Sequence, residues 1–278
     1  MYGASQALVQ NSASSPKMPM VKGLQPLYDI GCSPRQGELV MIAGRSGSMK
    51  STFALWLVDS WGKDTLYFSA DMSPFQASTK LASKRMGKTV EDIEEQMKGE
   101  GAAEIQEVLS ESKVRFSFGS PVKWRTLYAE LNAWVTLYGS YPSVIVIDNL
   151  QDVEESESDY AAQMFAMQTL SDLSRATGAS VLVLHHASDK SWEADSRPYR
   201  PPSRKEVKNG MSEKPELSLG VAFNGNSNEF NVAVIKQRMG PQDPTANSYA
   251  TLGVVADRNL FYDPRIETHL NRESMTNE

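Results

Sequence analysis

The chain has 278 residues, with 28 lysines and arginines against 34 aspartates and glutamates and a formal net charge of −6. This balance argues against a protein coated in basic charge, because sequence-independent binding of nucleic acid needs clustered cations. Hydrophobic residues form 40% of the chain, so it is long enough to bury a sizeable core. The single cysteine, Cys32, excludes an internal disulfide, and one cysteine with three histidines gives no zinc-ligand spacing.

No stretch approaches the roughly 18 consecutive apolar residues that a membrane span needs, and no signal peptide is readable. These features predict a protein without a membrane anchor, in a reducing, cytoplasmic setting. Residues 1–22, rich in serine and alanine, are expected to form a flexible leader, and residues 265–278 a polar tail. Between them we expect one folded domain, residues 23–264.

Short β-branched runs alternate with helical patterns through most of this domain. Strands are expected at 39–42, 65–68, 114–118, 144–147 and 181–184, with helices at 52–62, 75–86, 90–112, 123–138 and 158–177. The apolar runs lack polar alternation, which suits strands that are covered on both faces. The sequence therefore predicts an α/β fold around a mostly parallel sheet.

The last third of the chain has a different composition. Residues 189–214 are rich in proline, lysine and arginine, and they predict a mobile basic loop. Two further strands, 217–223 and 229–236, flank a turn and predict an antiparallel pair.

A glycine-rich segment follows the first strand and precedes the first helix, which is the context of a phosphate-binding loop. Its nucleotide-binding candidates are Gly44, Arg45, Ser46, Gly47, Ser48, Met49, Lys50, Ser51 and Thr52. Backbone N–H groups of small residues can turn toward phosphates, Lys50 adds a positive charge, and the Ser51 hydroxyl can hold Mg²⁺. The usual pattern has glycine where Met49 stands, so a plain glycine-rich turn with a surface lysine is the alternative interpretation.

A second motif lies about 95 residues further on. Residues 144–147 form an apolar run that delivers Asp148 at its carboxyl end, where open α/β sheets bind ligands. Asp148 can orient a water molecule on the Mg²⁺ that Ser51 contacts. A buried strand that ends at a helix cap is the alternative, but the two motifs together favour an ATPase that uses ATP and Mg²⁺. Asn149 follows Asp148, so a general base must come from another strand.

These motifs, in this order, make residues 23–264 similar to the RecA-type ATPase core of DnaB-family replicative helicases. The resemblance implies a RecA-like P-loop fold and places the base after the second strand, where this sequence has Asp71 in place of the family's glutamate. It also implies that His186 takes the place of a glutamine that senses the γ-phosphate, with a hydrogen-bonded core histidine as the alternative. The catalytic candidates are Lys50, Asp71, Asp148 and His186.

Residues 234–241 resemble the family's Lys-x-Arg-x-Gly-Pro segment. The resemblance implies that Lys236 and Arg238 form a trans finger that reaches the γ-phosphate of a neighbouring subunit. A basic strand end before a Gly-Pro turn is the alternative. With the finger, the chain is expected to form a homo-oligomer, most simply a hexameric ring. About 22 residues precede the resemblance, so we expect a stand-alone phage- or plasmid-type core without the family's helical N-terminal domain, in the host cytoplasm if phage-encoded.

Part of the basic loop is expected to contact single-stranded or forked DNA. The candidates are Arg197, Tyr199, Arg200, Arg204, Lys205 and Lys208. Prolines keep this stretch from folding as a helix, and Tyr199 lies between arginines as a stacking surface for a base; a solvated linker is the alternative. The overall negative charge does not oppose DNA binding, because residues 91–111 carry a net of −7 and leave +1 for the rest of the chain.

The sequence therefore predicts an Mg²⁺- and ATP-dependent, DNA-stimulated ATPase in replication or recombination that acts as a helicase on single-stranded DNA. One alternative is a nuclease that cuts forked DNA, since the acids between Asp148 and Asp159 could gather metal ions. A solvated loop before a helix is the simpler interpretation of those acids. Another alternative is a recombinase or an ATP-switched DNA-binding protein that does not unwind.

Overall fold

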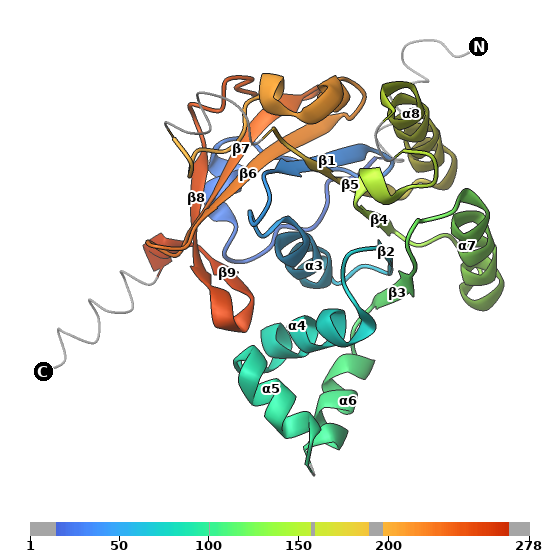
Figure 1. Cartoon of the computed structure of the whole chain (residues 1–278), viewed down its shortest axis with the longest axis vertical. Coiled ribbons are helices and arrows are strands. Elements are labelled where there is room, and N and C mark those ends of the chain that lie inside the picture. Colours follow the sequence, from blue (N-terminus) through green and yellow to red (C-terminus); the bar gives the residue numbers. More distant parts are fainter. Residues whose placement is uncertain (1–14, 100, 157–158, 189–196, 267–278) are drawn as a thin grey trace, which may run out of the picture.

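The computed structural model describes residues 15–99, 101–156, 159–188 and 197–266. Within these ranges the chain folds around a nine-stranded sheet with the order β3-β2-β4-β5-β1-β6-β7-β8-β9 (Figure 1). The strands from β3 to β6 in this order pair in parallel, and those from β6 to β9 pair antiparallel. The predicted α/β fold with C-terminal antiparallel strands is confirmed.

The predicted strands are all present, extended by at most two residues at an end. They are β1 (Leu39–Gly44), β2 (Thr65–Ser69), β3 (Val114–Phe118), β4 (Val144–Asp148), β5 (Ser180–His186), β6 (Leu217–Asn224) and β7 (Glu229–Gln237). Two further strands, β8 (Ala250–Val255) and β9 (Leu260–Tyr262), were not predicted.

The predicted helices are present except at one place, and the short α2 was not predicted. The helices are α2 (Gln25–Asp29), α3 (Lys50–Trp61), α4 (Pro74–Met86), α5 (Val90–Met97), α6 (Ala102–Ser110), α7 (Trp124–Tyr138) and α8 (Tyr160–Thr177), with short 3₁₀ turns η1 (Leu150–Asp152), η2 (Arg204–Glu206), η3 (Lys208–Glu213) and η4 (Ala256–Arg258). The prediction of a single helix over 90–112 is wrong, because this interval contains two helices, α5 and α6. Gly99 and Gly101 separate α5 from α6, because each glycine costs a helix interior about 1 kcal/mol relative to alanine.

In the described part of the chain, no helix combines the length and apolar character needed to cross a bilayer.

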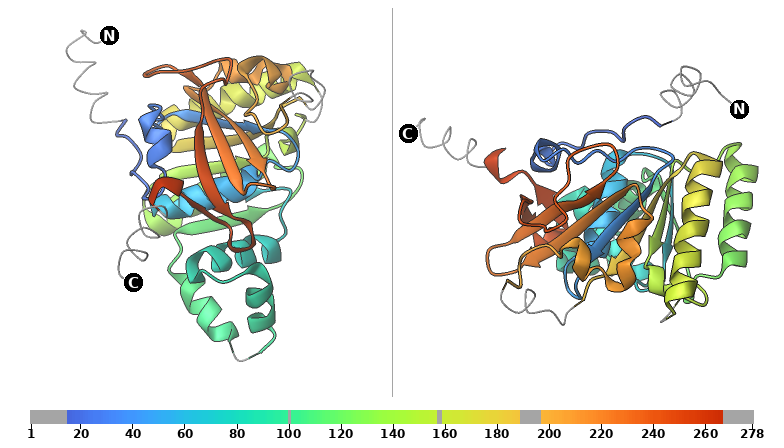
Figure 2. Two further views of the ribbon diagram at one scale, coloured as in Figure 1. Left: turned by 90° about the vertical axis from the view of Figure 1, so that its left-hand side faces the viewer. Right: turned by 90° about the horizontal axis from the view of Figure 1, so that it is seen from above.

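Helices cover both faces of the parallel part of the sheet (Figure 2). Along β1, Val40 and Ile42 belong to the core around α3, whereas Leu39 and Met41 belong to the core under α7 and α8. Successive side chains of a strand point to opposite faces, so a strand covered on both sides needs an unbroken apolar run. The antiparallel strands are joined to α3 by three rings, because Phe53 lies 4.7 Å from Phe230 and 5.2 Å from Phe261 between ring centroids.

Part of the expected leader and tail belongs to the folded domain. Met18 and Val21 are buried, and the Met18 N–H donates to the Pro34 carbonyl at 2.8 Å. At the other end, Arg265 pairs with Asp29 of α2 at 2.8 Å. Residues 1–14 and 267–278 lie outside the described residues.

The described part of the predicted basic loop is packed rather than free. Residues 197–214 carry η2 and η3, and Ser203 and Met211 are buried. The segment lies directly on β6, since a Cβ at Gly220 would be 2.4 Å from the Pro202 carbonyl oxygen. The expectation of a mobile loop is therefore wrong for these residues, and residues 189–196 lie outside the described ones.

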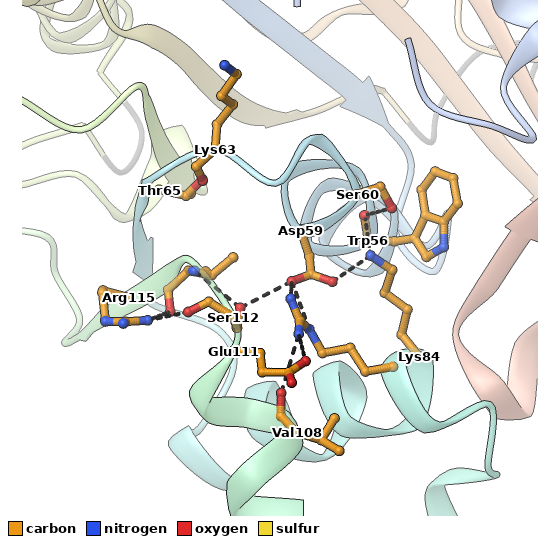
Figure 3. Close-up of polar contacts among 12 residues, drawn as sticks. Trp56, Asp59, Ser60, Lys63, Thr65, Lys84, Val108, Glu111, Ser112 and Arg115 are labelled. Atoms are coloured by element: carbon orange, nitrogen blue, oxygen red, sulfur yellow. Dashed lines mark hydrogen bonds and ion pairs between the residues drawn. The ribbon is translucent and has the colours of Figure 1, made fainter. Parts of the chain in front are cut away.

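Helices α4, α5 and α6 project from the sheet (Figure 1), and the buried carboxylate of Asp59 on α3 anchors them (Figure 3). Asp59 accepts hydrogen bonds from Lys84 Nζ at 2.6 Å, Arg85 Nη2 at 2.7 Å and Ser112 Oγ at 3.1 Å. Burial acts to raise the pKa of Asp59, but the bonds from Arg85 and Lys84 outweigh it and hold that pKa below its usual value. The carboxylate therefore stabilises the fold in its ionised form.

We predict that Asp59→Asn lowers the free energy of unfolding by about 3 kcal/mol, because two partly buried cations then face an amide. Urea unfolding measures the change. The matched control is Asp172→Asn, whose carboxylate is 61% exposed and should change stability by less than about 0.5 kcal/mol. Equal losses in both variants would contradict the anchoring role.

Candidate nucleotide site

The parallel strands bring the predicted site residues to one edge of the sheet. Gly44 of β1 lies beside His186 of β5, and Ser69 of β2 lies beside Asp148 of β4. Neighbouring parallel strands end at the same edge, and open α/β sheets bind ligands there. Asp71 follows β2 at this edge. The structure therefore brings four predicted site residues into one region, namely Gly44, Asp71, Asp148 and His186.

The loop between β1 and α3 is tightly wound around its glycines. A Cβ at Gly44 would lie 2.4 Å from Ser48 Oγ and 2.9 Å from the Val221 carbonyl oxygen. Gly47 has a φ of 71°, which glycine adopts without strain. Lys50 opens α3 and is 8% exposed, and its Nζ donates to the Arg45 carbonyl at 3.1 Å. The lysine therefore curls back over the loop.

Met49 has the backbone conformation for which the usual pattern places glycine. Its φ is 59° and its ψ is 23°, in the left-handed region. This conformation costs a residue with a Cβ about 1–2 kcal/mol. The half-buried Met49 side chain packs against the core around α3, which offsets part of the cost. The loop thus keeps the left-handed conformation that glycine usually adopts at this position, with Met49 strained in it.

Asp148 joins three elements at the centre of the site. Its Oδ1 accepts a hydrogen bond from Ser51 Oγ at 3.0 Å, and its Oδ2 accepts one from Tyr67 Oη at 2.8 Å. Burial raises the pKa of Asp148 to about 6, although the bonds from Tyr67 and Ser51 act to lower it. Burial and the neighbouring Asp148 raise the pKa of Tyr67 well above its usual value, so Tyr67 remains a donor.

Asp71 lies at the exposed edge of the same site. Its Oδ2 accepts a hydrogen bond from Asn149 Nδ2 at 3.1 Å, and Asn149 directly follows Asp148. Asp71 and Asp148, which are 77 residues apart in the sequence, therefore lie close together. The structure gives Asp71 the access to solvent that a group activating water requires.

The paired histidines at the end of β5 have different surroundings. His185 is fully buried, and burial lowers its pKa to about 4, so it is neutral near pH 7. Its Nε2 lies 3.0 Å from the Lys208 carbonyl oxygen, which can only accept, so Nε2 carries the proton. His185 is thus a hydrogen-bonded core residue. His186 is half-buried at the level of Gly44.

Lys236 and Arg238 lie at the opposite end of the strands, where the parallel strands begin. In the antiparallel pair, Gln237 is beside Leu217, which is beside Val40 near the start of β1. Val40 and Gly44 are four positions apart in β1, which places Lys236 and Arg238 about 13 Å or more along the strands from their own loop. Arg238 is exposed and lies 3.6 Å from Glu216, and burial lowers the pKa of Lys236 to about 8.

The predicted DNA-binding side chains do not share one environment. We call residues 197–208 the basic segment. Lys205 is exposed, and Arg204 and Lys208 are half-buried. Arg200 is 7% exposed and pairs with Glu206 at 2.9 Å. The expectation that Arg200 faces DNA is therefore wrong, because its guanidinium is taken up by an internal ion pair.

A hollow of about 380 Å³ opens beside the basic segment, and Arg197, Tyr199 and Tyr249 contribute to its lining. Both tyrosines are about two-fifths exposed, at 40% and 41%. The Tyr199 hydroxyl accepts a hydrogen bond from Asn226 Nδ2 at 3.2 Å. Tyr199 is thus held in place with its ring accessible.

Three acids of the segment after Asp148 make local contacts, and Glu157 of that segment lies outside the described residues. Asp152 caps the backbone of Asn149, Glu154 accepts from the Trp124 N–H at 3.3 Å, and Asp159 caps α8. Among the described residues, no group of three or more His, Cys, Asp or Glu side chains is arranged to hold a metal ion. Ser51 and Asp148 offer a hydroxyl and a carboxylate oxygen 3.0 Å apart beside the loop, which suits Mg²⁺ with water as its remaining ligands.

A family model described as an AAA domain matches residues 31–192, more than half of the chain. The chain belongs to this AAA domain family. The matched part holds the phosphate-binding loop, Asp71, Asp148 and His186. The basic segment and the pair of Lys236 and Arg238 lie beyond the matched residues.

Two curated relatives are phage proteins. The chain is 28% identical to the Gene 65 protein of Mycobacterium phage L5 over 272 residues, which is 95% of this chain and 99% of the relative. It is 26% identical to the Gene 65 protein of Mycobacterium phage D29 over 233 residues, which is 81% of this chain and 99% of the relative.

Solved structures share the fold of the AAA domain at low sequence identity. One of them, an isolated ATPase domain, aligns with a TM-score of 0.75 at 15% identity, covering 95% of this chain and 99% of that one. A DnaB-like replicative helicase, described with its interactions with primase, aligns with a TM-score of 0.73 at 15% identity, covering 94% of this chain and 67% of that one. The predicted fold, which is that of the ATPase core of DnaB-like helicases, is thereby confirmed.

Sequence reasoning missed three side chains that shape the site of the AAA domain. Tyr67 supports Asp148, and Glu206 binds Arg45 of the loop at 2.6 Å. Lys80 of α4 donates from Nζ to Thr52 Oγ1 at 2.9 Å, and burial lowers its pKa. A polar residue within an apolar strand was a readable signal for Tyr67, whereas no local pattern marks Lys80 or Glu206.

We predict that Met49→Gly is more stable than Met49→Ala by about 1 kcal/mol, because both lose the same side-chain packing and only alanine keeps the left-handed strain. Urea unfolding of the two variants measures the difference. At exposed Gln106 inside α6, the same pair of substitutions should reverse in order, with alanine more stable. The same order at both positions would contradict strain at Met49.

Proposed function

We propose that this AAA domain is an Mg²⁺-dependent ATPase that acts on DNA during phage replication. The proposal rests on the contact of Ser51 with Asp148, which joins the loop to the end of β4 within 3.0 Å. Ser51 and Asp148 would hold Mg²⁺, and Lys50, with backbone N–H groups from Gly44 to Thr52, would bind the phosphates. Bound Mg²⁺ supplies positive charge that offsets the charge on the phosphate oxygens.

In this proposal Asp71 is the general base. Its carboxylate accepts a proton from the attacking water, while the Asn149 amide, 3.1 Å away, holds it in place. His186, at the level of Gly44, would respond to the γ-phosphate. Aspartate is one methylene shorter than glutamate, so we expect slow turnover.

The proposal makes the active form a homo-oligomer, most simply a hexameric ring. Lys236 and Arg238 lie about 13 Å or more along the sheet from their own loop, so they can serve only a neighbour's γ-phosphate. A cation placed where charge spreads during phosphoryl transfer stabilises the transition state.

Single-stranded or forked DNA is the proposed partner. Lys205, Arg204 and Lys208 would contact phosphates, and Tyr199, beside Arg197, offers an accessible ring on which a base can stack. The positive charge of one basic segment is too small to bind DNA tightly, but several such segments that converge in a ring would add their charges. The two phage relatives make a bacterial host cytoplasm the proposed location.

We predict that Lys50→Ala lowers ATP hydrolysis by about 100-fold or more, because the phosphates lose their fixed positive charge.

Labelled forked DNA, incubated with Mg²⁺ with and without ATP, then identifies the reaction. Intact strands displaced only with ATP, and not by the variant, support a helicase. Strands cut without ATP would indicate the nuclease, and ATP-dependent filaments without displacement would indicate a recombinase.

We predict that Lys50→Ala and Arg238→Ala subunits are each inactive alone but recover about a quarter of the normal ATP hydrolysis when mixed in equal amounts. Random assembly places an intact loop opposite an intact finger at about one interface in four. The measurement is hydrolysis after the two proteins are mixed and reassembled. No recovery, with mixed oligomers demonstrated by mass spectrometry, would contradict a finger acting in trans.

A further inference from the structure

The phosphate-binding loop is tied to the basic segment by one of its own side chains. Arg45 is the second residue of the loop, and its guanidinium contacts the basic segment at two points. Nη2 pairs with Glu206 Oε1 at 2.6 Å, and Nη1 donates to the Arg200 carbonyl at 3.0 Å. The backbone of the loop is the part proposed to face the phosphates, whereas the side chain of Arg45 points to the basic segment.

Glu206 is the junction of these contacts. Its second oxygen, Oε2, accepts from Arg200 Nη2 at 2.9 Å and from the Ser203 N–H and Oγ, both at 2.7 Å. Its backbone carbonyl accepts from the Ser188 N–H at 2.8 Å, just beyond the end of β5. One residue therefore contacts the phosphate-binding loop, the exit of the strand that carries His186, and the basic segment.

The cluster of Arg45, Glu206 and Arg200 is withdrawn from solvent. The exposed fractions of the three side chains are 12%, 6% and 7%. Charges taken out of water must keep their partners, because a lone buried charge is strongly unfavourable. Arg45 and Glu206 can therefore separate only at a large energetic cost, so a displacement of the loop is transmitted to η2.

The cations proposed to contact DNA are attached to the same turn. Arg204 and Lys205 immediately precede Glu206 within η2, and Lys205 is exposed while Glu206 is buried. The Arg204 N–H donates to the Pro244 carbonyl at 2.8 Å, which fixes the turn from the other side. The position of Glu206 thus decides where these two cations lie.

We propose that Glu206 is a positioning residue that couples the two ligands of this protein, so that nucleotide at the phosphate-binding loop and single-stranded DNA at the basic segment each strengthen the binding of the other through Arg45. This inference rests on the proposed function. A loop ordered around phosphates holds Arg45 in one place, Arg45 holds Glu206, and Glu206 holds η2 in the form that binds DNA. Coupling of this kind is reciprocal and typically changes affinity by about 5–150-fold.

The test uses the full chain, a non-hydrolysable ATP analogue with Mg²⁺, and a fluorescent oligothymidylate. The affinity for DNA is measured with and without the analogue, and the affinity for the analogue with and without DNA. In the unaltered protein we expect each ligand to tighten the other by about 10-fold. In Glu206→Gln we expect that factor to fall below about 2-fold, and the factor, rather than either separate affinity, is the readout of the coupling.

Further variants separate coupling from stability. Arg45→Gln should lose the same factor, and the double variant should lose no more than either single one, because both residues act through one contact. Glu107→Gln, an exposed change on α6, is the matched control and should keep the full factor. If Glu206→Gln does not fold, Glu206→Asp keeps the charge and shortens its reach, and it should reduce the factor in part.

The outcomes are distinct. A purely structural role would lower the melting temperature and both separate affinities while leaving the ratio intact, and that result would overturn the inference. So would normal coupling in Glu206→Gln or Arg45→Gln. Failure of the unaltered chain to bind the analogue or DNA would instead remove the proposed function, and the coupling with it.

Discussion

The buried carboxylate of Asp148 is the constraint on which the rest of the site depends. It ends β4, and its two oxygens are shared between Ser51 of α3 and Tyr67 of β2. Burial raises its pKa to about 6, so the ionised form exists at a cost that the two hydrogen bonds offset only in part. A divalent cation favours that ionised form. In the proposed function, the oxygen that Asp148 shares with Ser51 is the kind of ligand that Mg²⁺ takes.

The two edges of the sheet have different roles in the proposed mechanism. The carboxyl ends of β1, β2, β4 and β5 gather the nucleotide-binding residues, and the antiparallel return of β7 carries Lys236 and Arg238 to the other edge. In that proposed mechanism, one subunit carries both halves of an active centre but cannot bring its own two halves together. Assembly and catalysis are then linked by geometry, while Glu206 links the loop to the basic segment within one subunit.

Local rules predicted the elements well where one residue pattern decides the outcome. Unbroken apolar runs identified the buried strands, since a strand covered on both faces has no polar alternation. The same reasoning failed where two effects compete, as in the interval between α5 and α6, where Gly99 and Gly101 override a helical pattern. It also failed for Arg200, because an arginine bound to DNA and an arginine bound to Glu206 have the same local sequence. Burial, which separates them, comes from distant contacts such as that of Pro202 with Gly220.

The sequence by itself determined the fold class, the phosphate-binding loop with its departure at Met49, and the position of Asp148 at a strand end. Each of these follows from spacing along one strand or one turn, where neighbours in the chain are neighbours in space. Only the tertiary structure decided that Tyr67 supports Asp148, that Asn149 holds Asp71, that Arg45 points to Glu206, and that Lys236 and Arg238 lie far from their own loop. These relations depend on strand order and on which charges are buried together, and both arise from contacts between residues that are distant in the sequence.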